Sequence, residues 1–404
     1  MLIQRDVYLQ KLIRAKDTDF IKVLSGIRRC GKSTLLNSIY YDYLLSIGIK
    51  PRQIIRVNFE SPQFNELKQD SSKLYGYLAN MVKGQKKSYI FLDEIQEVPG
   101  FETAINGLRV DYPVDIYITG SNSKMLSGEL VTYIGGRFIE IKMQPLSFSE
   151  YVTAFESTDY RRLFNDYMKF GGMPYSVVLQ DDEIRNMFFE GLFNTIVIRD
   201  ITTRKDIRDI NSLETVLRTV MSSIGSLVSA NKIHNTMVSK GYKISRETVQ
   251  NYLQYFVDAF ILYKASRYDI RGKQYLDNQC KYYVSDMGIR NYCLGYRQLE
   301  VTHALENIIY LELLKRGYTV DVGKCENNEI DFVCRSKTSV HYVQVAYTIA
   351  SEEKKEQELA SFKRLSDNYP KIVISLDDLP FSDIQDGIRH INAIDFLLNK
   401  VPLE

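Results

Sequence analysis

Several features that define other classes of protein are missing from this chain of 404 residues. No apolar run reaches the roughly 18 residues that a membrane span needs, and the first residues lack the charged-then-apolar layout of a signal peptide. The five cysteines show no paired metal-ligand spacing, and an odd number argues against a disulfide framework. We therefore expect a globular protein of the cytoplasm.

Charge of one sign, low-complexity tracts, long linkers and internal repeats are also lacking. A net charge of +2 gives no bulk attraction to nucleic acid, so any such binding must come from a local patch. A hydrophobic content of 45% with 25% charged residues is typical of a globular chain. The length is too great for one core of ordinary size and suggests two to four domains.

Residues 26–34 carry the most informative motif of the chain. They read Gly-Ile-Arg-Arg-Cys-Gly-Lys-Ser-Thr directly after the apolar run 21–25, which is the pattern G-x-x-x-x-G-K-[ST] between a strand and a helix. Glycines let such a loop curl its N–H groups toward phosphate oxygens, the lysine adds positive charge, and the serine hydroxyl can ligate Mg²⁺. The helix that follows adds the positive end of its dipole. The motif predicts binding of a nucleoside triphosphate with Mg²⁺ by Gly26, Ile27, Arg28, Arg29, Cys30, Gly31, Lys32, Ser33 and Thr34.

Two of those side chains have a second interpretation. Arg28 and Arg29 could touch the nucleotide, but a loop arginine that faces solvent or a neighbouring acid is as consistent with the sequence.

A second segment supplies the acids that hydrolysis requires. Residues 88–94 form an apolar, β-branched and aromatic run that ends in two carboxylates, the pattern of a buried parallel strand. Asp93 is placed to hold Mg²⁺, as a Walker B aspartate does, and Glu94 is a candidate to orient the attacking water. An acid pair at this position can also simply cap the next helix. We predict a catalytic set of Lys32, Asp93 and Glu94.

Further strands are expected at 53–59, 114–119 and 137–143, separated by helical stretches. This alternation predicts an α/β fold with a doubly wound parallel sheet and the ligand at the strand C-termini. Ser121 and Asn122 follow one of these strands, where related ATPases carry a polar sensor of the γ-phosphate. Arg137 directly precedes another of these strands, at the position where such ATPases carry an arginine finger that reaches a neighbouring subunit. The sequence agrees equally well with Arg137 being an ordinary surface arginine.

Five segments together resemble the archaeal-type AAA+ ATPases that carry an uncharacterised C-terminal domain. The segments are Ile21–Leu36, Leu92–Gln96, Thr119–Asn122, Gly136-Arg137 and Pro145–Phe148. The resemblance extends over nearly the whole chain. It implies an ATP-hydrolysing core, a winged helix-turn-helix and a degenerate restriction-endonuclease-like domain. We expect a P-loop AAA+ core at 1–145, a helical lid at 146–210, the winged helix-turn-helix at 211–292 and the PD-(D/E)xK nuclease-like domain at 293–404.

The pattern from 211 to 292 is helix, turn, helix and hairpin. Helices are expected at 213–228, from Ser229 with a serine or asparagine cap, and at 245–256. Short strands are expected at 261–265 and 282–284. If the unit binds DNA, Arg246, Gln250 and Asn251 would face the major groove, while Lys264, Arg267, Arg271, Lys273 and Lys281 would meet phosphates. Packing against the lid or a neighbouring subunit is the alternative role.

The last segment reads helix, three strands, helix and strand, an order that resembles the PD-(D/E)xK nuclease fold. The helix glutamate would be Glu306 and the metal-binding aspartate Asp331. The acid-x-lysine pair that would ligate Mg²⁺ and position water is here Gln344-Val345-Ala346. Because alanine can do neither task, the sequence favours a binding or scaffold role over cleavage.

The favoured function is a Mg²⁺-dependent ATPase that remodels DNA or another macromolecule, acting as a homo-oligomer if Arg137 works in trans. The alternative is a slow ATP-controlled switch or scaffold, and an ATP-regulated nuclease ranks third.

Overall fold

The fold comes from a computed structural model that describes residues 2–123, 135–202, 207–296, 301–326, 328–378, 383–385 and 387–403. The chain separates into two compact units. The first unit is Met1–Pro145 with Asp258–Phe260, and the second is Leu146–Val257 with Ile261–Glu404.

Within its described residues, the first unit contains a five-stranded sheet in the order β2-β3-β4-β1-β5. All of its neighbouring strands run parallel. The strands are β1 (Ile21–Ser25), β2 (Ile54–Asn58), β3 (Ser88–Asp93), β4 (Val114–Gly120) and β5 (Phe138–Lys142). The five predicted strands are thus confirmed, and β4 lies between the strand before the 26–34 loop and the strand that ends at Asp93.

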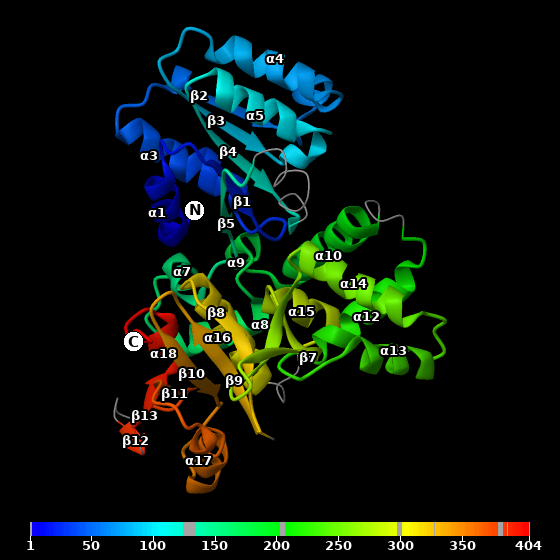
Figure 1. The fold of residues 1–404 in the computed structure, drawn as a ribbon, viewed down its shortest axis with the longest axis vertical. Coiled ribbons are helices and arrows are strands. Elements are labelled where there is room, and N and C mark those ends of the chain that lie inside the picture. Colours follow the sequence, from blue (N-terminus) through cyan, green and yellow to red (C-terminus); the bar gives the residue numbers. More distant parts are fainter. Residues whose placement is uncertain are drawn as a thin grey trace. The chain divides into compact units, whose positions relative to one another are not determined.

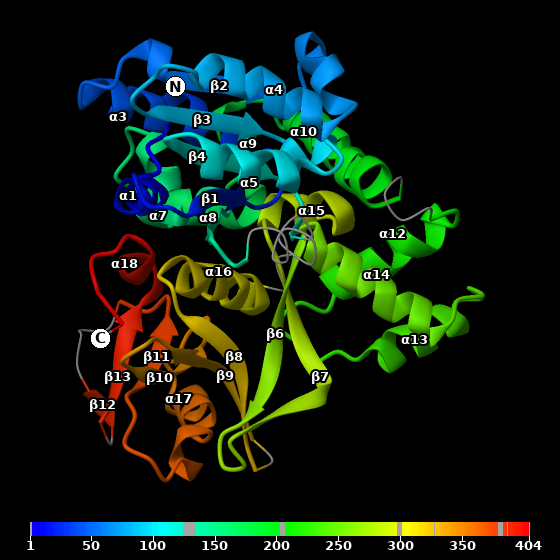
Figure 2. The same ribbon diagram turned by 45° about the horizontal axis from the view of Figure 1, so that its top comes forward.

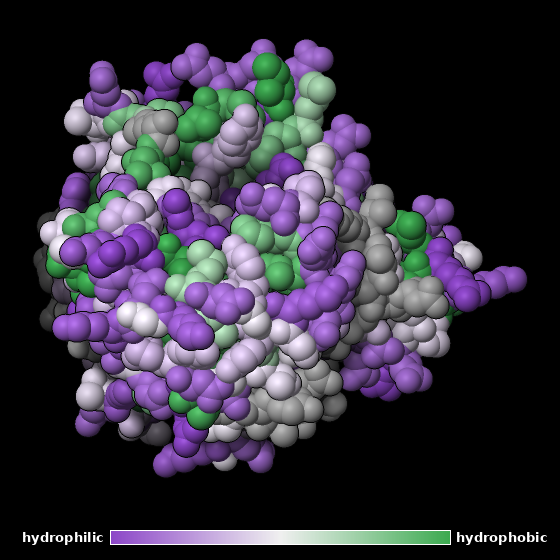
Figure 3. All heavy atoms as spheres, turned by 90° about the horizontal axis from the view of Figure 1, so that it is seen from above, coloured by the Kyte–Doolittle hydropathy of each residue, from purple (hydrophilic) through white to green (hydrophobic). Residues whose placement is uncertain are grey.

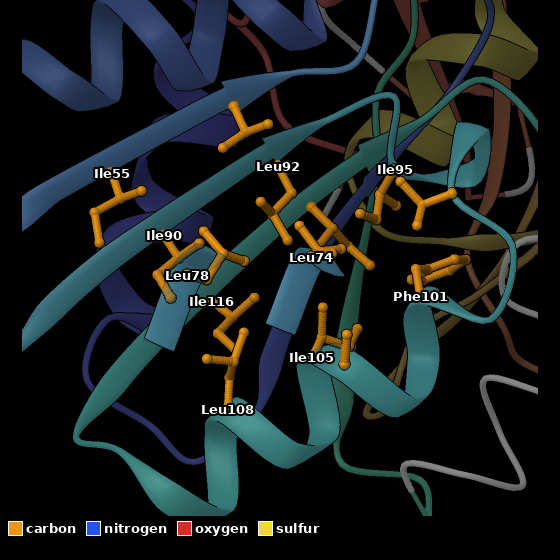
Figure 4. Packing of buried hydrophobic residues seen from close by; sticks show 14 of the residues in the cluster. Ile55, Leu74, Leu78, Ile90, Leu92, Ile95, Phe101, Ile105, Leu108 and Ile116 are labelled. Carbon is orange, nitrogen blue, oxygen red and sulfur yellow. The ribbon is translucent and has the colours of Figure 1, made fainter. Parts of the chain in front are cut away.

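Helices cover both faces of this sheet (Figure 1). On one face, α4 (Ser71–Val82) and α5 (Phe101–Asp111) pack on apolar side chains that alternate along the strands. Figure 4 shows that contact, with Ile90 and Ile116 of the sheet facing Leu78 and Leu108 of the helices. An α/β fold with a doubly covered parallel sheet is confirmed.

On the opposite face, Tyr40 packs against Phe91 and Tyr117 of the sheet. Tyr40 belongs to a helical segment that starts at Lys32, within the last residues of the 26–34 loop. That segment is α2 (Lys32–Thr34), the π-helical η1 (Leu35–Tyr40) and α3 (Tyr41–Ser46). The other elements of the first unit are α1 (Asp6–Ala15), η2 (Pro51–Gln53), η3 (Pro62–Lys68) and η4 (Ile95–Glu97).

The second unit begins with helices. Ser147 opens the first of them, because its hydroxyl accepts from the Glu150 N–H while the Glu150 carboxylate accepts from the Ser147 N–H. Within this unit, α10 continues without a break into the π-helical η7. The elements are α7 (Phe148–Tyr151), η6 (Val152–Ala154), α8 (Tyr160–Phe170), α9 (Pro174–Val178), α10 (Asp182–Asn194) and η7 (Thr195–Thr202).

The turn between α8 and α9 is held by a buried carboxylate. Asp286 caps α15 (Met287–Leu294) by accepting from the Ile289 N–H at 3.1 Å, and it also accepts from the Gly172 N–H at 2.6 Å. Burial raises the pKa of Asp286 to about 6, and these backbone hydrogen bonds limit the rise. Asp286 therefore fastens the Gly171-Gly172 turn to the start of α15.

Three helices follow, α12 (Ile210–Met221), α13 (Ala230–Ser239) and α14 (Arg246–Asp258). Ser229 caps α13 by accepting from the Lys232 N–H, as the sequence predicts. The first helix ends at Met221, earlier than the predicted 228, and Val228 instead forms a bridge with Cys280.

The rest of the second unit is built on a sheet that has eight strands among the described residues, in the order β12-β13-β11-β10-β9-β8-β6-β7. Its strands are β6 (Leu262–Asp269), β7 (Gln274–Val284), β8 (Thr319–Cys325), β9 (Asn328–Arg335), β10 (Val340–Val345), β11 (Lys371–Ser375), β12 (Asp383–Gln385) and β13 (Ile388–Asn392). The accompanying helices are α16 (Val301–Lys315), α17 (Glu352–Leu359), η9 (Phe362–Arg364) and α18 (Ala393–Leu397).

The hairpin β6–β7 is longer than the predicted strands and belongs to this sheet, because β6 pairs in parallel with β8 (Figure 2). The boundary predicted at 292/293 therefore falls between strands of one sheet.

None of the helices in the described ranges has the length and apolarity that a bilayer crossing requires. Hydrophilic side chains predominate on the face drawn in Figure 3.

Candidate functional site

The 26–34 loop has a backbone that only glycine permits at two positions. Gly26 has φ +149°, and a Cβ there would meet the Met143 carbonyl oxygen at 2.1 Å. Gly31, with φ +103°, forms the left-handed N-cap of α2. The two glycines thus set the curl of the loop between β1 and the following helix.

Lys32 folds back over that loop. Its side chain is buried, and Nζ donates to the carbonyl oxygens of Gly26 at 2.8 Å and Ile27 at 3.1 Å. The ammonium is therefore held at the centre of the loop, directly before the first turn of α2.

Asp93 lies buried at the carboxyl end of β3, next to the loop. Its Oδ1 accepts from the Ser33 hydroxyl at 3.0 Å and also from the Thr119 hydroxyl. Burial raises the pKa of Asp93, while the hydrogen bonds from Thr119 and Ser33 lower it. The structure thus brings Ser33 and Asp93 together, as the two motifs predict.

Glu94 adopts a left-handed conformation, with φ +55° and ψ +48°, that is uncommon for a residue with a side chain. Its N–H donates to the Thr119 hydroxyl at 3.0 Å. Its carboxylate accepts from the Gln96 amide and from the Ser121 hydroxyl, the latter at 3.3 Å. Ser121, a predicted sensor, therefore contacts the predicted catalytic acid, and Asn122 follows it half-buried.

The remaining loop residues divide by exposure. Ile27 and Cys30 are buried, whereas Arg29 and Thr34 are exposed. Arg28 forms an ion pair with Glu60, which agrees with the interpretation that a neighbouring acid holds it.

Arg5 is a loop-supporting residue that the sequence does not reveal. It is buried, and its guanidinium donates to the carbonyl oxygens of Cys30 at 2.9 Å and Gln144 at 2.7 Å. Arg5 thereby ties the loop to the segment after β5. An isolated arginine near the N-terminus carries no local signal for this contact.

Arg137 is not brought to the loop. It is exposed, and its carbonyl oxygen accepts from the Ile21 N–H at 3.0 Å, at the amino end of β1. The loop begins at the other end of β1, about 13 Å away for a strand of this length. Arg137 therefore lies at the amino ends of the strands, whereas Lys32 lies at their carboxyl ends.

Helices α13 and α14 present polar and basic side chains. Arg246, Gln250 and Asn251 are exposed on α14, as predicted. Lys232, Lys240 and Lys243, for which no sequence motif predicts a contact, are also exposed on or between these helices. Glu247 is the one acidic residue between 230 and 254. This α13–α14 surface, defined by Lys232, Lys240, Lys243, Arg246, Gln250 and Asn251, is therefore basic.

The hairpin contributes fewer free cations than predicted. Lys264 and Lys273 are exposed, but Arg267 is half-buried and donates to Gln279 at 3.0 Å. Arg271 is exposed and pairs with Glu326 at 2.6 Å. The prediction that Lys281 meets phosphates is wrong, because its side chain is only 2% exposed and lies among carboxylates.

Glu306, Asp331 and Gln344 do lie together, on α16, β9 and β10. The Asp331 N–H donates to the Gln344 Oε1 at 3.3 Å. Lys281 Nζ lies 2.9 Å from Glu306 Oε1 and 3.4 Å from Asp331 Oδ1. Burial and the nearby Glu306 charge raise the pKa of Asp331 to about 7. Burial alone would lower the pKa of Lys281, but the surrounding carboxylates outweigh it and raise that pKa.

Comparison with known proteins agrees with the geometry of the first unit. Residues 18–152 match the family model described as AAA domain, and residues 161–300 match a domain of unknown function, DUF8612. A Walker-type ATPase of Pyrococcus abyssi has a similar fold, with a TM-score of 0.51 and 14% identity over 72% of this chain and 95% of that one.

Relatives exist in bacteria and archaea. An uncharacterized protein of Haemophilus influenzae is 42% identical over 98% of this chain and 99% of its own length. An uncharacterized protein of Methanocaldococcus jannaschii is 29% identical over 98% of this chain and 88% of its own. The chain therefore belongs to the same family as the uncharacterized Haemophilus influenzae protein, and its first unit carries an AAA-type P-loop ATPase domain.

Proposed function

We propose that this protein binds ATP with Mg²⁺ at the 26–34 loop and hydrolyses it there. The observation that carries the proposal is the hydrogen bond of 3.0 Å between Ser33 and Asp93, next to the buried Lys32. It joins the residue after the loop lysine to the acid at the end of β3, two groups that come from motifs 60 positions apart.

The loop would bind the phosphates through its main chain and Lys32. The Lys32 ammonium donates to two loop carbonyl oxygens, and phosphate oxygens would compete for the same donors. Because the loop opens α2, its N–H groups and the helix dipole would favour the negative charge of a triphosphate.

The Ser33 hydroxyl and the Asp93 carboxylate fit a magnesium ion, because both are hard oxygen donors and they already lie within hydrogen-bond distance. Bound there, Mg²⁺ would neutralise charge on the phosphates. Across the described ranges, as the side chains stand, no group of three or more His, Cys, Asp or Glu residues forms a metal site.

Glu94 would orient and deprotonate the attacking water. Its carboxylate is held by Gln96 and Ser121, so its direction is fixed before substrate arrives. Thr119 accepts from the Glu94 N–H and donates to Asp93, which links the proposed base to the proposed metal ligand. The strained backbone at Glu94 is consistent with a functional constraint at this position.

Two substitutions test this assignment. Lys32→Ala should lose nucleotide affinity, measured by titration with a fluorescent ATP analogue. Glu94→Gln should bind ATP normally but hydrolyse it on the order of 10²–10⁴ times more slowly, the usual contribution of a general base. Glu97→Gln, three residues along the same turn, is the matched control. Unchanged affinity in Lys32→Ala would overturn the site, and full turnover in Glu94→Gln would show that another group is the base.

We propose further that Arg137 acts on the nucleotide of a second copy, because it lies at the end of the strands opposite its own loop.

The five cysteines, all free, support the assignment of the protein to the reducing cytoplasm.

Duplex DNA is the partner that the α13–α14 surface supports best. This surface carries four basic side chains, the 230–254 segment has one acidic residue, and the exposed amides of Gln250 and Asn251 lie farther along α14. A helix of this kind can enter a major groove while lysines nearby contact phosphates. We infer that ATP turnover is coupled to DNA through this surface, as part of a winged helix-turn-helix.

A salt titration tests the DNA proposal. The triple variant Lys240→Ala, Lys243→Ala, Arg246→Ala should weaken binding of a duplex oligonucleotide and flatten the dependence of affinity on salt by about 3 units of slope. The matched control replaces the exposed Lys337, Lys354 and Lys363 with alanine. Equal losses in both triple variants, or no binding at low salt with ATP present, would contradict the proposal. Turnover that ignores DNA would favour the slow switch over a remodelling ATPase.

A further inference from the structure

A buried lysine occupies the centre of an acidic cluster in the second unit. Lys281 Nζ lies 2.8 Å from Glu329 Oε1, 2.9 Å from Glu306 Oε1 and 3.4 Å from Asp331 Oδ1. The side chains of Lys281 and Glu306 are 2% and 6% exposed. We call Lys281, Glu306, Glu329 and Asp331 the Lys281 cluster.

The lysine comes from a different part of the chain than the nuclease-like pattern predicts. The pattern would put a lysine at position 346 on the strand that carries Gln344, but that residue is a buried alanine. Lys281 instead projects from β7, and its partners lie on α16 and β9. One side chain thus connects the hairpin to the helix and the sheet strand beside it.

The donors of the ammonium are fully used. An ammonium has three N–H donors, and three carboxylates surround this one. Other contacts fix the partners: the Tyr283 hydroxyl donates to Glu306 at 2.6 Å, and the Val345 N–H donates to Asp331 at 2.9 Å. The Gln344 side-chain amide does not contact Lys281, because its NH₂ group donates to Glu358 at 3.0 Å and its oxygen accepts from the Asp331 N–H. A lysine so placed has no donor left to orient water.

A divalent cation could not share this position with the ammonium, because both would lie within about 3 Å of the same oxygens and repel each other. Without a cation at this position, the Glu306 and Asp331 carboxylates would lie beside the partly exposed Glu329 with no positive charge between them, which is destabilising. The position therefore needs one cation and has room for one.

We propose that Lys281 is a built-in cation that replaces the metal ion of a nuclease-like site. The cluster then acts as a metal-independent clamp that fastens β7 to α16 and β9. It follows that β7, α16 and β9 hold together without a metal ion at this position, and that the cluster does not cleave phosphodiesters.

Manganese binding tests this inference. Mn²⁺ is titrated into nucleotide-free protein until the sites are saturated, and the number of ions bound per chain is read from the electron paramagnetic resonance signal of the free Mn²⁺. Lys281→Ala should bind one Mn²⁺ more per chain than the unsubstituted protein, and adding Asp331→Asn should abolish that extra ion. Lys264→Ala, an exposed lysine of the same hairpin, is the matched control and should bind no extra ion. A folded Lys281→Ala protein without the extra ion would overturn the proposal.

Two further measurements cover the case in which Lys281→Ala does not fold. The neutral triple variant Lys281→Met, Glu306→Gln, Asp331→Asn removes the buried charges together and should fold with the same Mn²⁺ count as the unsubstituted protein. The unsubstituted protein should also leave single- and double-stranded DNA uncut with Mg²⁺ or Mn²⁺. Metal-dependent cutting that Asp331→Asn abolishes would overturn the inference while leaving the proposed ATPase site untouched.

Discussion

The contact between Arg5 and the 26–34 loop gives a quantitative prediction. Replacing Arg5 with methionine keeps an apolar stem of similar length but removes the guanidinium. The Cys30 and Gln144 carbonyl oxygens then lose donors at 2.9 and 2.7 Å in a buried region. A hydrogen bond to a charged group contributes about 1.5–3 kcal/mol, so the two together are worth about 3–6 kcal/mol.

Because the lost contacts hold the loop, we expect the effect to concentrate there. Hydrogen exchange of amides in η1, directly after the loop, should be about a hundredfold faster or more, since each 1.4 kcal/mol is a factor of ten. The urea midpoint should fall, and ATP affinity should weaken because the loop is no longer ordered before binding.

The matched control is Arg14→Met, an exposed arginine on α1, the helix that begins directly after Arg5. It should change stability by less than about 0.5 kcal/mol, as surface substitutions usually do. If Arg5→Met matches this control in exchange, urea midpoint and ATP affinity, the reasoning about buried loop support is refuted.

Two other predictions concern an interface and a titration. The Arg137→Ala and Lys32→Ala variants should each be inactive alone. A mixture of the two should recover part of the ATPase rate, because the intact loop of one copy can then meet the intact Arg137 of another. If the mixture is shown to associate and no rate is recovered, Arg137 is only a surface residue. Asp286, whose pKa is raised from 3.8 to about 6, binds its proton more tightly when folded, so its stabilising contribution is full below pH 3.8 and is lost as pH rises through about 6. The contribution of Asp286 to the free energy of unfolding is about 3 kcal/mol. Urea midpoints measured from pH 4 to 7.5 should fall more for the unsubstituted protein than for Asp286→Asn, which has no carboxyl group to titrate at this position. Parallel pH profiles for the two proteins would contradict the assignment.

The sequence predicted the parts of the site that depend on local pattern. The loop glycines, the strand before Asp93 and the cap at Ser229 each have a signal within a few residues, and the structure confirms all three elements. The Ser33–Asp93 contact follows from a parallel sheet, whose carboxyl ends meet at one edge.

The features that could not be predicted from the sequence are contacts between residues far apart in the chain. Arg5 reaches a carbonyl 139 positions away, and no periodicity encodes such a contact. Counting Lys281 as a solvent-facing cation was wrong for the same reason, because its partners Glu306 and Asp331 come from elements far along the chain. The hairpin was predicted too short, since the pairing of β6 with β8 extends it.

That strand pairing has a consequence for how the protein can be divided. Arg267, Tyr268 and Asp269 each face a partner on β8, at Val322, Gly323 and Lys324. A fragment that stops at 300, where the DUF8612 match ends, would leave β6 as a bare edge, which invites pairing with other molecules and aggregation. The region that matches DUF8612 is therefore smaller than the sheet to which its hairpin belongs, and a fragment made for folding studies needs to include β8.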